Sequence, residues 1–171
     1  MSNKKLLLDA KQVDLKIKRL SNEVAEKYYD ANELYIFGIE GQGFLLANKI
    51  KKEVHDLIDI KLVLGKININ KNDPIGSIKV DKKLLEVIKN KDVLLIDDVL
   101  NSGKTLFYAM QAFVEIPLHS LKVLVLVNRS HQQFPVHPDF VGMSLSTTYE
   151  NHIEAELNNK KTAKVFLVNK R

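Results

Sequence analysis

Short apolar runs alternate with amphipathic stretches along the first half of the chain. Residues 9–31 carry apolar side chains at spacings of three and four with charges between them, which predicts a helix that packs by one face. The apolar run 34–39 predicts a short strand, and EGQG at 40–43 predicts a tight glycine loop. Helical spacing returns at 45–54. The pattern therefore predicts a strand that leads into a helix through a glycine loop.

The second half repeats this alternation. Residues 59–69 alternate apolar and polar positions, which predicts a strand, and the Asn, Asp, Pro and Gly of 71–77 predict a flexible loop. The runs 93–97 and 121–127 are apolar throughout, as expected for central parallel strands that are covered on both faces. A last apolar run at 163–168 is expected to close the same sheet.

Strands that alternate with helices imply right-handed crossovers and a parallel sheet. Because no internal repeat or boundary is visible, we predict a single α/β domain over residues 1–171. Ligands of such sheets bind beyond the carboxyl ends of the strands. The loops predicted at 40–43 and 97–105 both lie at that edge, so they are the candidate functional segments.

Composition narrows the class of protein. The chain has no cysteine, which excludes disulfides and thiolate metal sites. Its apolar start at 6–8 stops at Asp9, too short for a signal peptide, and no run approaches the roughly 20 apolar residues of a membrane helix. We therefore expect a cytoplasmic protein with no membrane partner.

The net charge of +5 favours anionic partners, although the lysines form scattered pairs instead of one basic run. Dispersed lysines are most often a solvated surface. The alternative is that some of them form a patch for RNA or phosphates. The sequence alone leaves both interpretations open.

The stretch VLLIDDVLNSGKT, residues 93–105, ends like an ATP-binding P-loop, in Gly103, Lys104 and Thr105. Such a loop also needs a glycine five residues before Gly103, where bare backbone amides wrap the phosphates. That position is Asp98, and Asp97 precedes it. Because two carboxylates would repel a triphosphate, the sequence argues against a nucleoside triphosphatase.

The same residues suit a ligand with two different ends. Paired carboxylates such as Asp97 and Asp98 accept hydrogen bonds from vicinal hydroxyls and attract a divalent cation. The start of a helix at 102–105, with two hydroxyls, suits a phosphate dianion. Together the two subsites describe a ribose 5-phosphate. The plainer alternative is that Asp98 or Ser102 only caps the helix.

The stretch resembles the phosphoribosyl diphosphate (PRPP) signature of type I phosphoribosyltransferases. Residues 125–142, VLVNRSHQQFPVHPDFVG, closely resemble the segment that follows in PyrR, the family of pyrimidine-operon regulators and uracil phosphoribosyltransferases. The resemblance runs from about residue 10 to the carboxyl terminus. It implies the type I phosphoribosyltransferase fold, a mainly parallel central sheet flanked by helices.

The resemblance also implies an activity. Members of the family transfer phosphoribose from PRPP to uracil with Mg²⁺ as cofactor, giving UMP and pyrophosphate, and some bind messenger RNA in a UMP-dependent way. Relatives form dimers or higher assemblies, so a homo-oligomer is expected. Positive charge develops on the ribose as the bond breaks, and carboxylates near the ring would stabilise it.

The family's functional residues carry over position by position. No protein cage for a metal is expected; Mg²⁺ would enter with PRPP, near the acidic pair, and the loop histidines are not expected to hold zinc. The implied site consists of Asp97 and Asp98 for the ribose hydroxyls, Asn101, Ser102, Gly103, Lys104 and Thr105 for the 5-phosphate, Glu40, Gly41, Gln42 and Gly43 for pyrophosphate, and Arg129, His131, Phe140 and Val141 for the base.

Three functions stay open at this stage. Asn101 stands where purine-using relatives carry an acid/base Asp, which favours a uracil enzyme. Glu40 stands in a loop where the family usually has basic residues, and with the surplus lysines it favours a nucleotide-sensing RNA-binding regulator with weak or absent catalysis. Gly41 and Gly43 still permit close backbone approach to pyrophosphate. A purine-type phosphoribosyltransferase is the third possibility.

Overall fold

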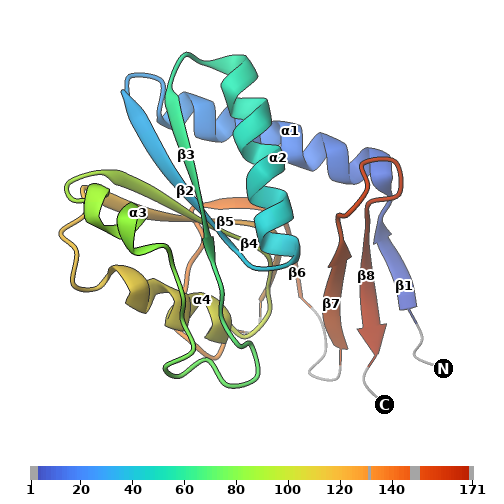
Figure 1. Cartoon of the computed structure of the whole chain (residues 1–171). Helices are drawn as coiled ribbons and strands as arrows, with labels where there is room; N and C mark the ends of the chain where they lie inside the picture. Colours follow the sequence, from blue (N-terminus) through green and yellow to red (C-terminus); the bar gives the residue numbers. More distant parts are fainter. Residues whose placement is uncertain (1–3, 131, 147–150, 170–171) are drawn as a thin grey trace.

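The computed structural model describes residues 4–130, 132–146 and 151–169, which form two sheets (Figure 1). The larger sheet has five strands in the order β3-β2-β4-β5-β6, and every neighbouring pair is parallel. This confirms the predicted mainly parallel α/β architecture. The strands are β2 (Glu33–Ile39), β3 (Lys61–Ile67), β4 (Asp92–Leu100), β5 (Ser120–Arg129) and β6 (Phe140–Leu145).

Helices cover both faces of this sheet (Figure 1). Helices α1 (Ala10–Lys27) and α2 (Gln42–Leu57) lie on one face; α3 (Lys82–Val87), α4 (Lys104–Ala109) and the 3-10 helix η1 (Met110–Phe113) lie on the other. Alternate residues of β4 enter the two cores: Leu94 and Ile96 pack with α1 and α2, whereas Val93 and Leu95 pack with α4 and η1. Burial on both sides explains why the run is apolar throughout.

Helix α1 begins one residue later and ends four residues earlier than predicted. Asp9 accepts a hydrogen bond from the backbone N–H of Gln12, and the Gln12 side chain accepts one from the backbone N–H of Asp9, each at 2.9 Å. This reciprocal cap fixes the start of the helix. Residues 28–31 form a turn, in which the backbone N–H of Ala31 donates to the carbonyl of Tyr28.

The strand predicted at 163–168 exists, but its predicted place in the main sheet is wrong. β8 (Lys164–Asn169) pairs antiparallel with β1 (Lys4–Leu8) and with β7 (Asn151–Glu156), forming a separate sheet in the order β1-β8-β7. The chain enters this small sheet after β6, and the apolar start supplies its third strand. Figure 1 shows the small sheet standing to one side of the five-stranded sheet.

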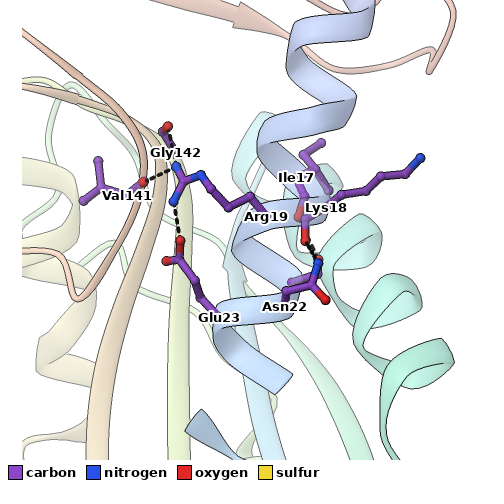
Figure 2. Close-up of polar contacts among 8 residues, drawn as sticks. Ile17, Lys18, Arg19, Asn22, Glu23, Val141 and Gly142 are labelled. Carbon is purple, nitrogen blue, oxygen red and sulfur yellow. Dashed lines mark hydrogen bonds and ion pairs between the residues drawn. The ribbon is translucent and has the colours of Figure 1, made fainter. Parts of the chain in front are cut away.

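The edge strand β6 is covered by a side chain of α1. Arg19 donates from Nη2 to the carbonyl oxygens of Val141 at 2.8 Å and Gly142 at 2.6 Å, and from Nη1 to the carboxylate of Glu23 (Figure 2). Edge strands present backbone groups that can pair with another chain. Arg19 occupies two of these acceptors and ties α1 to the strand on which Val141 lies.

The region between β3 and α3 has no helix or strand of its own, in agreement with the predicted loop at 71–77. Asn68 and Lys79 exchange backbone hydrogen bonds of 2.9 Å, which close the base of the excursion. The strand predicted at 93–97 is longer than expected: the prediction that residues 98–100 belong to a loop is wrong, because β4 continues to Leu100 and pairs there with Asn128 of β5. Asp97 and Asp98 are therefore both strand residues, and Asp97 pairs with Val125 of β5.

Candidate active site

A cavity of about 340 Å³ lies at the carboxyl end of β4. Residues 97–106 form one wall, and residues 153–156 of β7 form the other. Lys71, from the loop after β3, also lines the cavity. Seven of the predicted site residues, Asp97, Asp98 and the run from Asn101 to Thr105, are thus brought together at the sheet edge where ligands of parallel sheets bind.

The turn between β4 and α4 depends on one glycine. Gly103 has φ of 84°, a left-handed conformation that strains other residues, and an added Cβ would lie 3.3 Å from the carbonyl oxygen of Phe134. The Ser102 hydroxyl accepts a hydrogen bond from the backbone N–H of Lys104 at 3.3 Å. Helix α4 has only six residues, so its dipole is weak, and the donors available at this turn are the hydroxyls of Ser102 and Thr105 and the ammonium of Lys104.

The segment after β5 holds this turn from outside. The carbonyl oxygen of Ser102 accepts hydrogen bonds from the backbone N–H groups of Gln133 at 2.8 Å and Phe134 at 3.1 Å. Phe134 also packs beside Phe107 and Tyr108 of α4, with ring centroids 5.3 and 6.0 Å away. Residues 133 and 134, which lie in the segment predicted to approach the base, are therefore hydrogen-bonded to the turn predicted to bind phosphate.

The acidic pair is buried. Asp97 is 3% exposed and Asp98 is 9% exposed, and the backbone N–H of Asp98 donates to Asp97 Oδ1 at 3.0 Å. Burial, and then the neighbouring charge of Asp98, raise the pKa of Asp97 well above its ordinary value, while Lys71 Nζ, 3.9 Å from Oδ1, acts in the opposite direction. Two buried carboxylates with one distant cation favour a ligand that brings hydroxyl donors or a divalent cation.

The glycine loop predicted at 40–43 is shorter than expected, because α2 begins at Gln42, and Gly43 in its first turn lies against Asp97. Gly41 has φ of 91° and stands at the start of α2. A Cβ added to Gly43 would lie 2.7 Å from Asp97 Oδ1 and 3.1 Å from Asp97 Cα, so only glycine lets α2 approach β4 this closely. Gly38 of β2 is equally tight, since its Cβ would lie 2.7 Å from Phe44 Cα. Gly43 thus packs against Asp97, but residues 40–43 are not among those that line the cavity.

The two side chains of the EGQG loop have partners within the protein. Glu40 Oε1 lies 3.6 Å from Lys66 Nζ, an ion pair in which both side chains are about half exposed. Gln42 accepts a hydrogen bond from the backbone N–H of Leu157 and donates one to Asn158. The charge of Glu40 is thus compensated locally, and it does not stand alone against a bound anion.

Three of the four residues predicted to approach the base, Arg129, Phe140 and Val141, are not among the residues that line the cavity. Arg129 is buried at the carboxyl end of β5. Phe140 is buried in the core beneath α1, and Val141 is half-buried on the edge strand, where its carbonyl accepts from Arg19. His131 lies outside the described residues.

Sequence reasoning missed the second wall. Ile153 and Ala155 point into the core, whereas Glu154 and Glu156 form ion pairs with Lys4 of β1 at 2.8 and 3.6 Å. The pattern of NHIEAE at 151–156 alternates with period two, which is the signal of a half-buried strand. That signal could have identified β7, although not its position opposite β4.

Neither a metal cage nor a membrane-spanning helix occurs in the described part of the chain. Within residues 4–130, 132–146 and 151–169, no three His, Asp or Glu side chains gather as a metal cage. In the same ranges no helix has the length and apolar character needed to cross a bilayer. The carboxylates of Asp97 and Asp98 are oxygen donors of the kind that Mg²⁺ accepts, as one or two protein ligands beside substrate phosphates.

Comparison with known proteins identifies the class. The family model described as the phosphoribosyl transferase domain matches residues 4–160. Among solved structures, a hypoxanthine phosphoribosyltransferase of Trypanosoma cruzi has a TM-score of 0.76 at 16% identity, covering 98% of this chain and 97% of that chain. At this identity the likeness shows the fold, which is the type I phosphoribosyltransferase fold predicted from the sequence.

Closer relatives carry the name PyrR. A bifunctional protein PyrR of Microcystis aeruginosa is 35% identical over 157 residues, which cover 88% of this chain and 89% of that protein. Another, of Clostridium novyi, is 27% identical over 176 residues, with 97% and 99% covered. The chain therefore belongs to the phosphoribosyltransferases and, within them, to the PyrR family, as the resemblance of residues 93–105 and 125–142 indicated.

Proposed function

We propose that this protein transfers the phosphoribosyl group of PRPP to uracil and releases UMP and pyrophosphate. The observation that carries the proposal is the single cavity in which the buried carboxylates of Asp97 and Asp98 stand next to the hydroxyl-bearing turn 101–105. A carboxylate pair beside a hydroxyl-bearing turn suits the hydroxyl end and the phosphate end of a ribose 5-phosphate. Membership of the phosphoribosyltransferase family supports the reaction class.

The acidic pair and the turn 101–105 have separate roles in this reaction. Asp97 and Asp98 accept hydrogen bonds from the ribose hydroxyls, while the turn 101–105 binds the 5-phosphate. The C1–O bond of PRPP breaks with its electron pair leaving on pyrophosphate, a ring nitrogen of the base forms the C1–N bond, and the proton of that nitrogen is released. The acidic pair stabilises positive charge that develops on the ribose. Mg²⁺, when bound with PRPP, supplies neutralisation of the pyrophosphate charge.

Pyrophosphate would meet the loop 40–43 through its backbone. Gly41 and Gly43 leave the start of α2 open to close approach, and α2 begins beside Asp97. Because Lys66 pairs with Glu40, the repulsion expected from that carboxylate is reduced. Lys71, which already lines the cavity, adds a cation on the same side.

A base panel tests the proposal. The protein is incubated with PRPP, Mg²⁺ and uracil, hypoxanthine, guanine or xanthine, and pyrophosphate release is measured. Asn101, in place of an acid, favours uracil as the substrate. Release with uracil alone is expected, release with a purine would move the assignment to a purine enzyme, and no release with any base would reject an enzyme. Asp98→Asn serves as the inactive control.

A second candidate is a regulator that binds RNA in response to UMP or PRPP. It is favoured by the word bifunctional in the names of the relatives and by the net charge of +5. RNA affinity should fall steeply with salt and change with nucleotide. Filter binding of a pyrimidine-gene leader transcript at several salt concentrations, with and without UMP, measures both. Affinity that is insensitive to nucleotides would reject sensing.

The protein is also proposed to act as a homo-oligomer, an expectation carried over from the family. Light scattering coupled to size-exclusion chromatography measures the mass of the particle against the 19.5 kDa of one chain. A mass equal to one chain across the working concentration range would contradict this part of the proposal.

A further inference from the structure

One side chain of the glycine loop crosses to the small sheet. Gln42 Oε1 accepts a hydrogen bond from the backbone N–H of Leu157 at 2.6 Å, and Gln42 Nε2 donates to Asn158 Oδ1 at 3.2 Å. These partners are 115 and 116 residues away in the sequence. Leu157 directly follows β7, whose residues 153–156 form the second wall of the cavity. Gln42 thus joins the start of α2, which packs against Asp97 of one wall, to the end of the other wall.

The rest of the attachment of the small sheet is mostly apolar. Ile153, Ala155, Leu157 and Val165 are buried in the core formed with α1 and α2. Such contacts are not directional, so by themselves they do not specify one position of the sheet over the helices. Lys160, in the turn between β7 and β8, pairs with Asp14 of α1 at 3.0 Å, but it is largely exposed. The hydrogen bond at Leu157 is directional, which is the property needed to set how far β7 stands from β4.

We propose that Gln42 is a positioning residue: its side-chain amide latches the end of β7 to the start of α2 and so keeps the cavity at its binding width. In this assignment the side chain does not bind pyrophosphate, which the loop contacts through its backbone. The kinetic part of the assignment rests on the proposed phosphoribosyltransferase function, whereas the structural part does not.

The chemistry of glutamine suits this role. The latch needs an acceptor for a backbone N–H and a donor for an amide oxygen at the end of a side chain of this length, and glutamine carries both. Gln42→Met keeps the length but removes both hydrogen bonds. Gln42→Glu keeps the acceptor for the Leu157 N–H, and Asn158 can turn its amide to donate to the carboxylate. The two variants therefore separate hydrogen bonding from packing.

Amide hydrogen exchange of the complete, ligand-free protein gives the first measurement. In Gln42→Met the Leu157 amide should exchange roughly five- to tenfold faster, the equivalent of one backbone hydrogen bond. Gln42→Glu should restore protection. Gln111→Met, at an exposed glutamine on η1, is the matched control and should leave Leu157 unchanged. Unchanged Leu157 exchange in Gln42→Met would overturn the latch.

Kinetics give the second measurement. Unlatching shifts the population toward open forms that must close on binding, so KM for PRPP should rise up to about tenfold, while the closed complex reacts with nearly the original kcat. Asn158→Ala, which leaves the loop intact, should change KM in the same direction, and the double variant should be no worse than Gln42→Met alone. Loss of pyrophosphate binding in Gln42→Met but not in Asn158→Ala would instead make Gln42 a ligand and refute the assignment.

The two measurements keep the proposals apart. The exchange experiment needs no substrate, so a protein without transferase activity would reject the proposed function and leave the latch to be decided by the Leu157 amide alone. If the protein is active but the exchange rate of the Leu157 amide is unchanged in Gln42→Met, the latch is rejected and the proposed function stands.

Discussion

The two walls of the cavity are built in different ways. The wall from β4 is the end of a strand that has hydrogen-bonded neighbours on both sides and an apolar core on both faces. The wall from β7 belongs to a three-stranded sheet in which the buried residues, such as Ile153 and Ala155, occupy one side, while charged side chains occupy the other. The first wall is therefore supported on more sides than the second.

This difference suggests a division of labour. The β4 wall carries the acidic pair and the turn 101–105, which in the proposed reaction must be held in fixed positions to stabilise developing charge. The β7 wall contributes the charged side chains of Glu154 and Glu156, which pair with Lys4 at the rim of the cavity. If the comparison is right, substitutions on the β4 side change the chemistry or the global stability, whereas those on the β7 side have local effects.

Removal of a charge from each wall should give the largest contrast. Asp98→Asn is expected to lower kcat/KM for PRPP roughly 10²- to 10³-fold, because a stabilising group at the reacting ribose is lost. Glu154→Gln, on β7 in the same cavity, is expected to lower it less than about tenfold, since its carboxylate pairs with Lys4 at the rim. Steady-state kinetics measures both, and equal losses would remove the distinction between the walls.

A matched pair of core truncations tests the difference in rigidity. Leu95 of β4 and Leu157 after β7 are both fully buried. Leu95→Ala should lower the free energy of global unfolding by about 2–5 kcal/mol in denaturant melts. Leu157→Ala should mainly accelerate amide exchange in β7 and β8, because a region with one buried face opens on its own. Faster exchange throughout β4 and β5 in Leu157→Ala would show that the two sheets unfold as one unit.

The pH dependence of stability should report the buried Asp97. Burial and then the charge of Asp98 raise the pKa of Asp97, so the folded protein holds a proton that the unfolded chain releases above about pH 4. Stability from this group is present below that pH and is lost as pH rises through the folded pKa. Asp97→Asn, which keeps the oxygen that accepts from the Asp98 N–H, should flatten this decline and raise Tm at neutral pH. A lower Tm at neutral pH would contradict the charge argument.

Arg19, which covers the edge strand β6, should contribute modestly to the free energy of unfolding. Arg19→Ala leaves the carbonyls of Val141 and Gly142 without their donor, and the cost should be about 1 kcal/mol, because the side chain is nearly half exposed and water replaces part of the bond. The free energy of unfolding of Arg19→Lys should lie between those of the unmodified protein and Arg19→Ala, since an ammonium lacks the planar fork of guanidinium. Chemical denaturation measures all three proteins, and a Lys variant as weak as Ala would show that the geometry of the fork decides.

The smallest effect is expected for Lys4 of β1. Its ion pairs with Glu154 and Glu156 are exposed, and such pairs contribute little because water competes and long side chains must be ordered. Lys4→Ala should leave Tm unchanged in thermal melts at low salt and at high salt. A clear drop in Tm at low salt that disappears at high salt would give this pair a larger role in holding the small sheet.

The sequence predicted the regions that obey a strong local rule. The apolar runs of β4 and β5 predicted strands buried on both faces, and the run from Asp97 to Thr105 was correctly placed at the carboxyl edge of the sheet, where it lines one cavity. That this turn binds phosphate stays a prediction. The position of the small sheet could not be predicted in this way. Antiparallel pairing of β8 with β1 joins the two ends of the chain, and no local pattern specifies a partner at that distance.

Individual side chains of the glycine loop were harder still. The sequence shows that Glu40 is acidic and Gln42 polar, but not that Lys66 stands beside the first or that Leu157 binds the second. Lys66 comes beside Glu40 through the parallel register of β2 with β3, and Leu157 comes beside Gln42 because the chain after β7 passes the start of α2. The charge of a loop in isolation is therefore a poor guide to the field that a ligand meets.

The doubly accepting carbonyl of Ser102 has a consequence for engineering. Since Gln133 and Phe134 both donate to it, the β4–α4 corner is completed by a segment that follows the next strand. A transplant of residues 97–105 into another parallel sheet would lack this brace, and the grafted turn would relax away from its left-handed glycine. A portable module has to include residues 132–136 as well, in two discontinuous pieces.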